Sequence, residues 1–185
     1  EPVDSHRRVY LNGELAAHVL GFVQTQERSV GSQTVPYASG RAGIESTFDK
    51  HLQGVLGWRT TETDSRRREQ VALRSMDVDP VDGLNVHLTI DAGVQAIVEE
   101  ELKRGVDVST PLTATVIVAQ PHTGAVLAMA NYPTFDPNHP GDYPARNRRN
   151  RAISDQIEPG STFKIVSVAS AIESQVVSLD SRFDC

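Results

Sequence analysis

Apolar and polar residues recur along the first part of this chain with the periods of short strands and helices. The apolar runs 9–11 and 14–23 flank Asn12-Gly13. Asn-Gly between apolar runs is typical of a two-residue β-hairpin turn, because both central positions of that turn adopt positive φ. Over 44–56 the apolar positions fall on one face of a helix, which Gly57 can end. The pattern therefore predicts a β-hairpin followed by an amphipathic helix.

Two further strands are predicted on either side of an arginine-rich turn. Trp58–Asp64 and Glu69–Ser75 have the composition of strands, and the arginines at 66–68 between them are expected at a solvated hairpin tip. The next segment, 77–83, contains Asp-Pro and Asp-Gly and is rich in turn signals. We place a domain boundary there. The predicted domains are 1–76 and 77–185.

The second domain is predicted to begin with a strand, Asn85–Ile90, and a helix. Asp91 is expected to cap the N-terminus of that helix and Gly105 to end it. The positions expected to be buried are Val94, Ile97, Val98 and Leu102.

An apolar hairpin and a long polar loop follow that helix. The runs 113–119 and 125–130 are apolar on both faces and are joined by a turn at 121–124, which indicates antiparallel strands in the interior of a sheet. Residues 131–150 are rich in Pro, Asn, Asp and Arg and are predicted to form a loop of a length that is often functional. Together the elements indicate an α+β fold.

Composition narrows the possible functions. The 185 residues are 38% hydrophobic and 23% charged, with a net charge of −6, which argues against nucleic acid as a partner. Cys185 is the one cysteine, so this chain can build neither an internal disulfide nor a thiolate metal site. The six histidines have no ligand-like spacing. We therefore predict no metal and no cofactor.

The candidate chemistry lies in the last predicted helix, at Ser161 and Lys164. Pro159-Gly160 precedes the helix, and seven of the eleven residues in 162–172 are apolar and spread around it, which predicts a buried helix. Residues three apart share a helix face, so Lys164 can reach the hydroxyl of Ser161. Burial would favour the neutral amine, which is a competent base for a serine hydroxyl. A free N–H group at the helix start can stabilise an oxyanion.

The local pattern has a second interpretation of equal weight. Ser161 could cap the helix, and Lys164 could be ion-paired or extend its amine to the surface. Ser-x-x-Lys is short enough to occur by chance, so the choice depends on the surrounding residues.

Those surrounding residues resemble the class B penicillin-binding proteins. Ser-x-x-Lys is known in these proteins and in β-lactamases. The ordered segments that resemble the family are Gly40–Glu45 with Phe48-Asp49, Leu52 and Gly54, then Leu88–Asp91 followed by Gln95, then Pro121–Ala130, Tyr132–Asn138, Asn150–Asp155 and Glu158–Lys164.

The resemblance implies a β-rich pedestal of the dimerisation type, followed by the first part of a serine penicillin-recognising transpeptidase domain. It implies that Ser161 attacks the D-Ala-D-Ala end of a peptidoglycan stem peptide, that Lys164 acts as the base, and that β-lactams acylate the same serine. The family acts on the outer, periplasmic face of the cytoplasmic membrane in cell division, elongation and shape. A membrane anchor would lie upstream of Glu1, and the pedestal would bind other cell-wall, divisome or elongasome proteins.

Two further family motifs, Ser-x-Asn and Lys-Thr/Ser-Gly, do not occur in these 185 residues. We therefore expect the chain to be a fragment without normal transpeptidase activity. Efficient, Ser161-dependent labelling of the isolated chain by a fluorescent penicillin would contradict this expectation.

Two other functions stay open. Ser-Thr-Phe-Lys also resembles class D β-lactamases and related antibiotic sensors, for which rapid deacylation would be the sign. Residues 1–76 argue against that alternative, because a lone β-lactamase domain has no use for them. The second is a non-catalytic module that binds partners in cell-wall assembly through residues 1–76.

Overall fold

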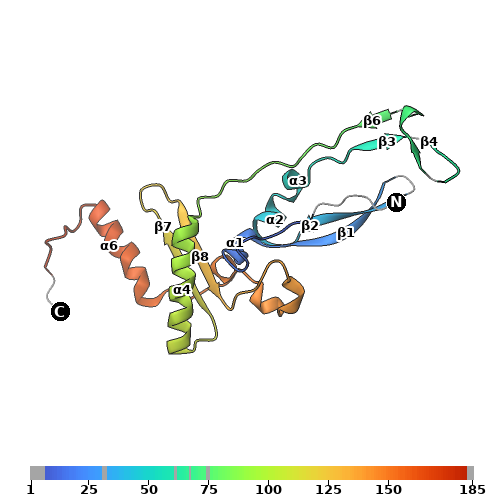
Figure 1. The fold of residues 1–185 in the computed structure, drawn as a ribbon. Helices are drawn as coiled ribbons and strands as arrows, with labels where there is room; N and C mark the ends of the chain where they lie inside the picture. The colour runs from blue at the N-terminus through green and yellow to red at the C-terminus, as the bar shows by residue number, and fades with distance from the viewer. Residues whose placement is uncertain (1–6, 31–32, 61, 67, 74–75, 183–185) are drawn as a thin grey trace. The chain divides into compact units, whose positions relative to one another are not determined.

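The computed structural model describes residues 7–30, 33–60, 62–66, 68–73 and 76–182. It divides into two compact units, Glu1–Ser154 and Asp155–Cys185, which are described separately (Figure 1). The elements of the first unit are α1 (Ala17–Leu20), β1 (Val23–Val30), β2 (Gln33–Gly40), α2 (Gly43–Thr47), α3 (Asp49–Leu52), β3 (Trp58–Thr60), β4 (Glu62–Thr63), β5 (Glu69–Gln70), η1 (Val71–Leu73), β6 (Met76–Val78), α4 (Ala92–Ser109), β7 (Ala114–Ala119), β8 (Val126–Tyr132), η2 (Pro140–Asp142), η3 (Ala145–Asn147) and α5 (Arg151–Ser154). The second unit holds η4 (Gly160–Phe163) and α6 (Lys164–Glu173).

The prediction of a β-hairpin around Asn12-Gly13 is wrong. Residues 11–16 form consecutive turns that lead into α1, although Gly13 does adopt a positive φ of 57°. Contacts with a distant part of the chain replace strand pairing. The backbone of Tyr10 exchanges two hydrogen bonds with the Asn138 side chain, and the Asn150 side chain donates to the carbonyl of His18. Partners about 130 residues away thus override the local hairpin signal.

The first hairpin of the structure is instead β1–β2, a long antiparallel pair that the sequence analysis missed. Its register runs from Val23↔Gly40 to Val30↔Gln33.

The predicted helix over 44–56 is shorter than expected and is divided into two helices. It forms α2 and α3 and ends at Leu52, and Gly54 then has a φ of 66°. Helical periodicity alone did not reveal this early stop.

The arginine-rich hairpin tip is confirmed in the described residues. Strands β4 and β5 pair around it, and Asp64 accepts hydrogen bonds from the Arg68 backbone and side chain. The flanking strands are shorter than predicted, and β3 pairs with β6 rather than with β5. Ser75 lies outside the described residues. Pairing continues at Val81, which bridges to Val55, so the segment 77–83 is more regular than its turn signals suggest.

Helix α4 begins as predicted but differs in length and in its buried face. Asp91 accepts a hydrogen bond from the Val94 amide at 2.9 Å, which confirms the N-cap. The helix passes through Gly105 and ends at Ser109. Its buried residues are Gln95 and Val106, whereas Ile97 is 63% exposed. The strand predicted over 85–90 is wrong, because the described residues of this segment form no strand. The Thr89 hydroxyl and, just after the segment, the Asp91 amide donate hydrogen bonds to carbonyls of β8.

The hairpin β7–β8 forms as predicted, with a register from Ala114↔Tyr132 to Ala119↔Val126 and an irregularity at Val118/Ala119. Helix α4 packs against this hairpin, mainly on β8 (Figure 1). Ala128 and Ala130 of β8 are buried there, whereas Ile117 of β7 is half exposed. The pair therefore has one covered face and one face that is partly open in this chain, rather than the fully interior position that was predicted.

Residues 133–150 form the predicted long loop, with only the short turns η2 and η3. The loop is held by Phe135, which is completely buried and makes edge-on ring contacts with His18, Phe22 and Tyr143 at centroid distances of 5.2 to 6.4 Å. His18 and Phe22 come from the N-terminal part of the chain. This aromatic cluster therefore joins the N-terminal segment to the loop within one core.

Candidate active site

Ser161 and Lys164 lie where a 3₁₀ turn becomes an α-helix. Ser161 is the second residue of η4, and Lys164 is the first residue of α6. The Lys164 amide donates to the carbonyl of Ser161, which closes the turn between them. A 3₁₀ helix has three residues per turn, so side chains at i and i+3 are almost aligned along its axis. The local backbone therefore directs the serine hydroxyl and the lysine stem to the same side.

The turn that precedes this pair is formed by Pro159 and Gly160. Gly160 has a φ of 53°, which a residue with a side chain adopts only with strain. The amide and hydroxyl of Thr162 both donate to the Pro159 carbonyl, which fixes the first turn of the helix. Proline-glycine thus sets the point at which the helix begins, and with it the position of Ser161 at the helix N-terminus.

The expected burial of this helix is not found in the described chain. No residue of α6 is buried, and both Ser161 and Lys164 are exposed. Phe163, Ile165, Val166 and Val168 each expose more than half of their surface. The apolar residues surround the helix, and a helix of that kind needs packing surface on several sides. The described residues of the second unit do not provide that surface, so the low-polarity setting expected for Lys164 is not provided within that unit.

No hydrogen bond between the Ser161 hydroxyl and the Lys164 amine is present in the described residues. The exposed apolar side chains of α6 nevertheless indicate a contact surface, because large exposed apolar patches mark surfaces that are covered by another element or partner. The helix therefore supplies the geometry of a serine–lysine pair but not its environment.

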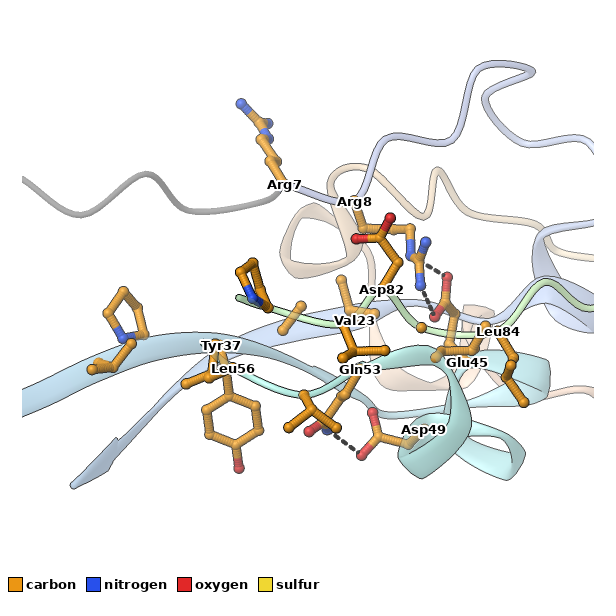
Figure 2. A pocket seen from close by; sticks show the side chains of 18 of the residues that line it. Arg7, Arg8, Val23, Tyr37, Glu45, Asp49, Gln53, Leu56, Asp82 and Leu84 are labelled. Atoms are coloured by element: carbon orange, nitrogen blue, oxygen red, sulfur yellow. Dashed lines mark hydrogen bonds and ion pairs between the residues drawn. The ribbon is translucent and has the colours of Figure 1, made fainter. Parts of the chain in front are cut away.

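A pocket of about 370 Å³ lies elsewhere, among residues between 7 and 85, and its lining includes neither Ser161 nor Lys164 (Figure 2). Its lining includes both charged and apolar residues. Arg8 contacts both carboxylate oxygens of Glu45, at 2.8 and 3.3 Å, and Asp49 accepts a hydrogen bond from Gln53. The Tyr10 hydroxyl also contacts Glu45, and burial together with this carboxylate raises the Tyr10 pKa. These pairs satisfy one another and fix α2 beside the N-terminal segment.

In the described residues there is no group of three or more His, Cys, Asp or Glu side chains that could hold a metal ion. None of the described helices has both the length and the apolar character that a membrane span requires.

Two family models match consecutive parts of the chain. The penicillin-binding protein dimerisation domain matches residues 1–88, and the penicillin-binding protein transpeptidase domain matches residues 114–185, which include Ser161 and Lys164. The chain belongs to the class B penicillin-binding proteins. The match to the dimerisation domain also argues against a lone β-lactamase domain, and the α+β fold of pedestal plus the start of a transpeptidase domain is confirmed.

Curated relatives and solved structures agree with this membership. The chain is 33% identical to the probable peptidoglycan D,D-transpeptidase PenA of Neisseria meningitidis over 96% of this chain and 29% of PenA. It is 36% identical to the peptidoglycan D,D-transpeptidase FtsI of Escherichia coli over 94% of this chain and 27% of FtsI. Penicillin-binding protein 2X of Streptococcus thermophilus shares the fold, with a TM-score of 0.73 over 93% of this chain and 25% of that protein at 24% identity. The chain thus spans less than a third of these relatives.

Three of the buried polar residues of the first unit, His18, Gln95 and Asn131, were not predicted to be buried, although Gln95 belongs to a segment that resembles the family. Each has a partner far along the chain, and the hydrophobic periodicity used to predict elements does not report such partners. The Asn150–Asp155 segment had been singled out only for its family resemblance, although Asn150 proves to be part of the same polar network.

Proposed function

We propose that Ser161 is the acyl-accepting nucleophile of a peptidoglycan D,D-transpeptidase in the full-length protein that carries this chain. The observation that supports this most directly is the Ser161–Lys164 pair on one 3₁₀ turn, inside the segment that matches the transpeptidase model. Its relatives PenA and FtsI are named for this activity.

In the proposed acylation, the Lys164 amine takes the proton of the Ser161 hydroxyl as the oxygen attacks the carbonyl of the penultimate D-Ala. The negative charge that develops on the carbonyl oxygen is stabilised by N–H groups at the start of the helix, which have no partner within it. The peptide C–N bond then breaks, the terminal D-Ala leaves with a proton, and an ester to Ser161 remains. An amine from a neighbouring stem peptide attacks that ester, which forms the cross-link and restores the hydroxyl.

β-Lactams are proposed to acylate Ser161 in the same way, because their strained amide presents a carbonyl in the position of the scissile bond. Neither reaction requires a metal or an organic cofactor. Residues 1–88 match the dimerisation domain, and we propose that they form the pedestal through which other proteins of the division or elongation machinery bind. We place the protein at the outer face of the cytoplasmic membrane, held by an anchor upstream of Glu1. The domain boundary at 76/77 also stays a prediction.

Labelling of the full-length protein by a fluorescent penicillin tests the proposal. Ser161→Ala should abolish covalent labelling, and Lys164→Ala should slow it by a factor of at least about 100, which is the usual contribution of a general base. Ser167→Ala is a matched control, because Ser167 is an exposed serine of α6, which directly follows η4, and its hydroxyl donates to the Phe163 carbonyl. Undiminished labelling of the Ser161→Ala protein would overturn the proposal.

The rate at which the acyl-enzyme is hydrolysed separates transpeptidation from β-lactamase activity. A penicillin-binding transpeptidase should hold the acyl group for a long time in the absence of an acceptor amine. Rapid turnover of the antibiotic would instead favour the class D β-lactamase alternative.

A further inference from the structure

Two asparagine side chains join three parts of the first unit just before the chain reaches Ser161. Asn131 is near the end of β8 and is only 5% exposed, and Asn150 directly precedes α5. The Asn131 amide nitrogen donates to the Asn150 side-chain oxygen at 3.0 Å. Buried amides are costly unless their donors and acceptors are satisfied, so the partners of this pair reveal what it holds together.

Asn131 connects the strand pair to α5. Its side-chain oxygen accepts from the Thr115 hydroxyl of β7 at 2.9 Å and from the Ala152 amide of α5 at 3.0 Å. Thr115 and Asn131 face each other in the β7–β8 register, so strand pairing fixes the position of this oxygen, which also accepts the α5 amide. Strand geometry therefore determines where the first turn of α5 lies.

Asn150 connects the same junction to the N-terminal segment. Its amide nitrogen donates to the carbonyl of His18 in α1 at 3.2 Å and lies 3.5 Å from the Met129 sulfur. Its own carbonyl accepts from the Ile153 and Ser154 amides, which are the backbone bonds of α5. One residue thus links α1 to α5 and also begins α5.

Apolar packing contributes little to the position of α5. The helix is a single turn of four residues, and its one large apolar side chain, Ile153, is 75% exposed. At its other end the Arg149 guanidinium donates to the hydroxyl and carbonyl of Ser154. Isolated helices of this length are unstable in water, so the placement of α5 depends on these polar contacts.

We infer that Asn131 and Asn150 are positioning residues for the nucleophile, an inference that rests on the proposed function of Ser161. Ser161 follows Ser154, the last residue of α5, by seven positions (161 − 154), so α5 fixes the start of a short tether to the serine. A displacement of α5 would move that starting point, and misplacement of a reacting group by about 1 Å can reduce a rate by about 100-fold.

The test is two-step acylation kinetics of the full-length protein with a penicillin, which separates the dissociation constant Ks from the acylation rate constant k2. Asn150→Ala and Asn131→Ala should each lower k2 by about tenfold or more and leave Ks within about twofold. The double variant should be no slower than about the slower single variant, because both residues act through one junction. Asn147→Ala is the matched control, since the Asn147 side chain is in the same loop and donates its hydrogen bond to the Thr134 carbonyl, within that loop.

Near-isosteric variants keep the test decisive if the alanine variants do not fold. Asn131→Asp keeps the acceptor for Thr115 and Ala152 but removes the donor to Asn150, and Asn150→Asp removes the donor to His18. Faster amide exchange in 151–160 together with a lower k2 would support the inference. A k2 within twofold of the unmodified protein in folded variants would overturn it. Labelling that persists after Ser161→Ala would instead refute the proposed nucleophile, so the two failures are distinguishable.

Discussion

Gln95 offers the sharpest test of how the first unit is held together. Its side chain is fully buried and completes the hydrogen bonding of Met129 in β8. The side-chain oxygen accepts from the Met129 amide at 2.8 Å, and the nitrogen donates to the Met129 carbonyl at 3.0 Å and to Glu99 at 2.6 Å. The amide therefore acts as a strand partner for one residue of β8.

Gln95→Glu preserves the shape of the side chain but replaces the amide nitrogen, a hydrogen-bond donor, with a carboxylate oxygen, which is an acceptor. The new carboxylate would face the Met129 carbonyl and the Glu99 carboxylate, both of which are acceptors, at the distances given above. The buried group avoids this repulsion by taking a proton. Holding an ordinary glutamate protonated at pH 7 costs about 3.7 kcal/mol, because each pH unit above its usual pKa of about 4.3 costs about 1.4 kcal/mol. We therefore expect destabilisation of up to about 3.7 kcal/mol.

The pH dependence distinguishes this mechanism from simple loss of contacts. The folded-state pKa of the new carboxyl would be raised, so the penalty is largest at high pH and disappears as the pH falls toward about 4.3. Gln95→Ala should cost about 2–4 kcal/mol through the unpaired Met129 groups, with no such dependence on pH. Amide hydrogen exchange of Val126–Tyr132 measures both effects, and up to about 500-fold faster exchange is expected for Gln95→Glu at pH 7. A penalty below about 1 kcal/mol, or one that does not change with pH, would refute this reasoning.

Four other perturbations, made by substitution or by pH, probe the same unit. Phe135→Ala should destabilise it by about 3–5 kcal/mol, because a fully buried ring is removed from the aromatic cluster; a cost below about 1 kcal/mol in thermal unfolding would contradict that packing. Burial lowers the pKa of His18, so stability should be complete above pH about 6.5 and decline as the pH falls below it, and His18→Gln should flatten this part of the pH profile. Gly21→Ala should be strongly destabilising, since φ is 79° and the new Cβ would lie 1.8 Å from the Ala42 carbonyl oxygen. Gly105→Ala, within α4 and with free space around it, should stabilise by about 0.5–1 kcal/mol in the same measurement.

The predictions that succeeded rest on chemistry within a few residues. Asp91 caps α4, the β7–β8 hairpin closes over a turn that contains Gly124 at a φ of 74°, and the last helix begins after Pro159-Gly160. In each case the turn or cap residue and the apolar period agree. The Ser161–Lys164 spacing is of the same kind, because one helical turn fixes it.

The predictions that failed involve competition between local and distant partners. Asn12-Gly13 supports a hairpin locally, but Tyr10 and His18 bond to the loop at 133–150. Ile97 fits the apolar period of α4, yet it is exposed, whereas Gln95 is buried and its side chain pairs with the backbone of Met129. A periodicity rule that assigns apolar residues to the buried face cannot find a buried glutamine.

The sequence by itself determined the order of the main elements in the second half, the three-residue spacing of Ser161 and Lys164 at the start of the last helix and, through its ordered motifs, the family. Only the tertiary structure decided that the N-terminal segment joins the 133–150 loop, that amides rather than apolar contacts hold α5, and that α6 is not buried by the described residues of its own unit. The physical reason is the separation along the sequence between the groups that interact. Caps, turns and spacing act over a few residues and are written in the local sequence, whereas burial and amide pairing depend on groups about 20 to 130 positions apart, which no local pattern specifies.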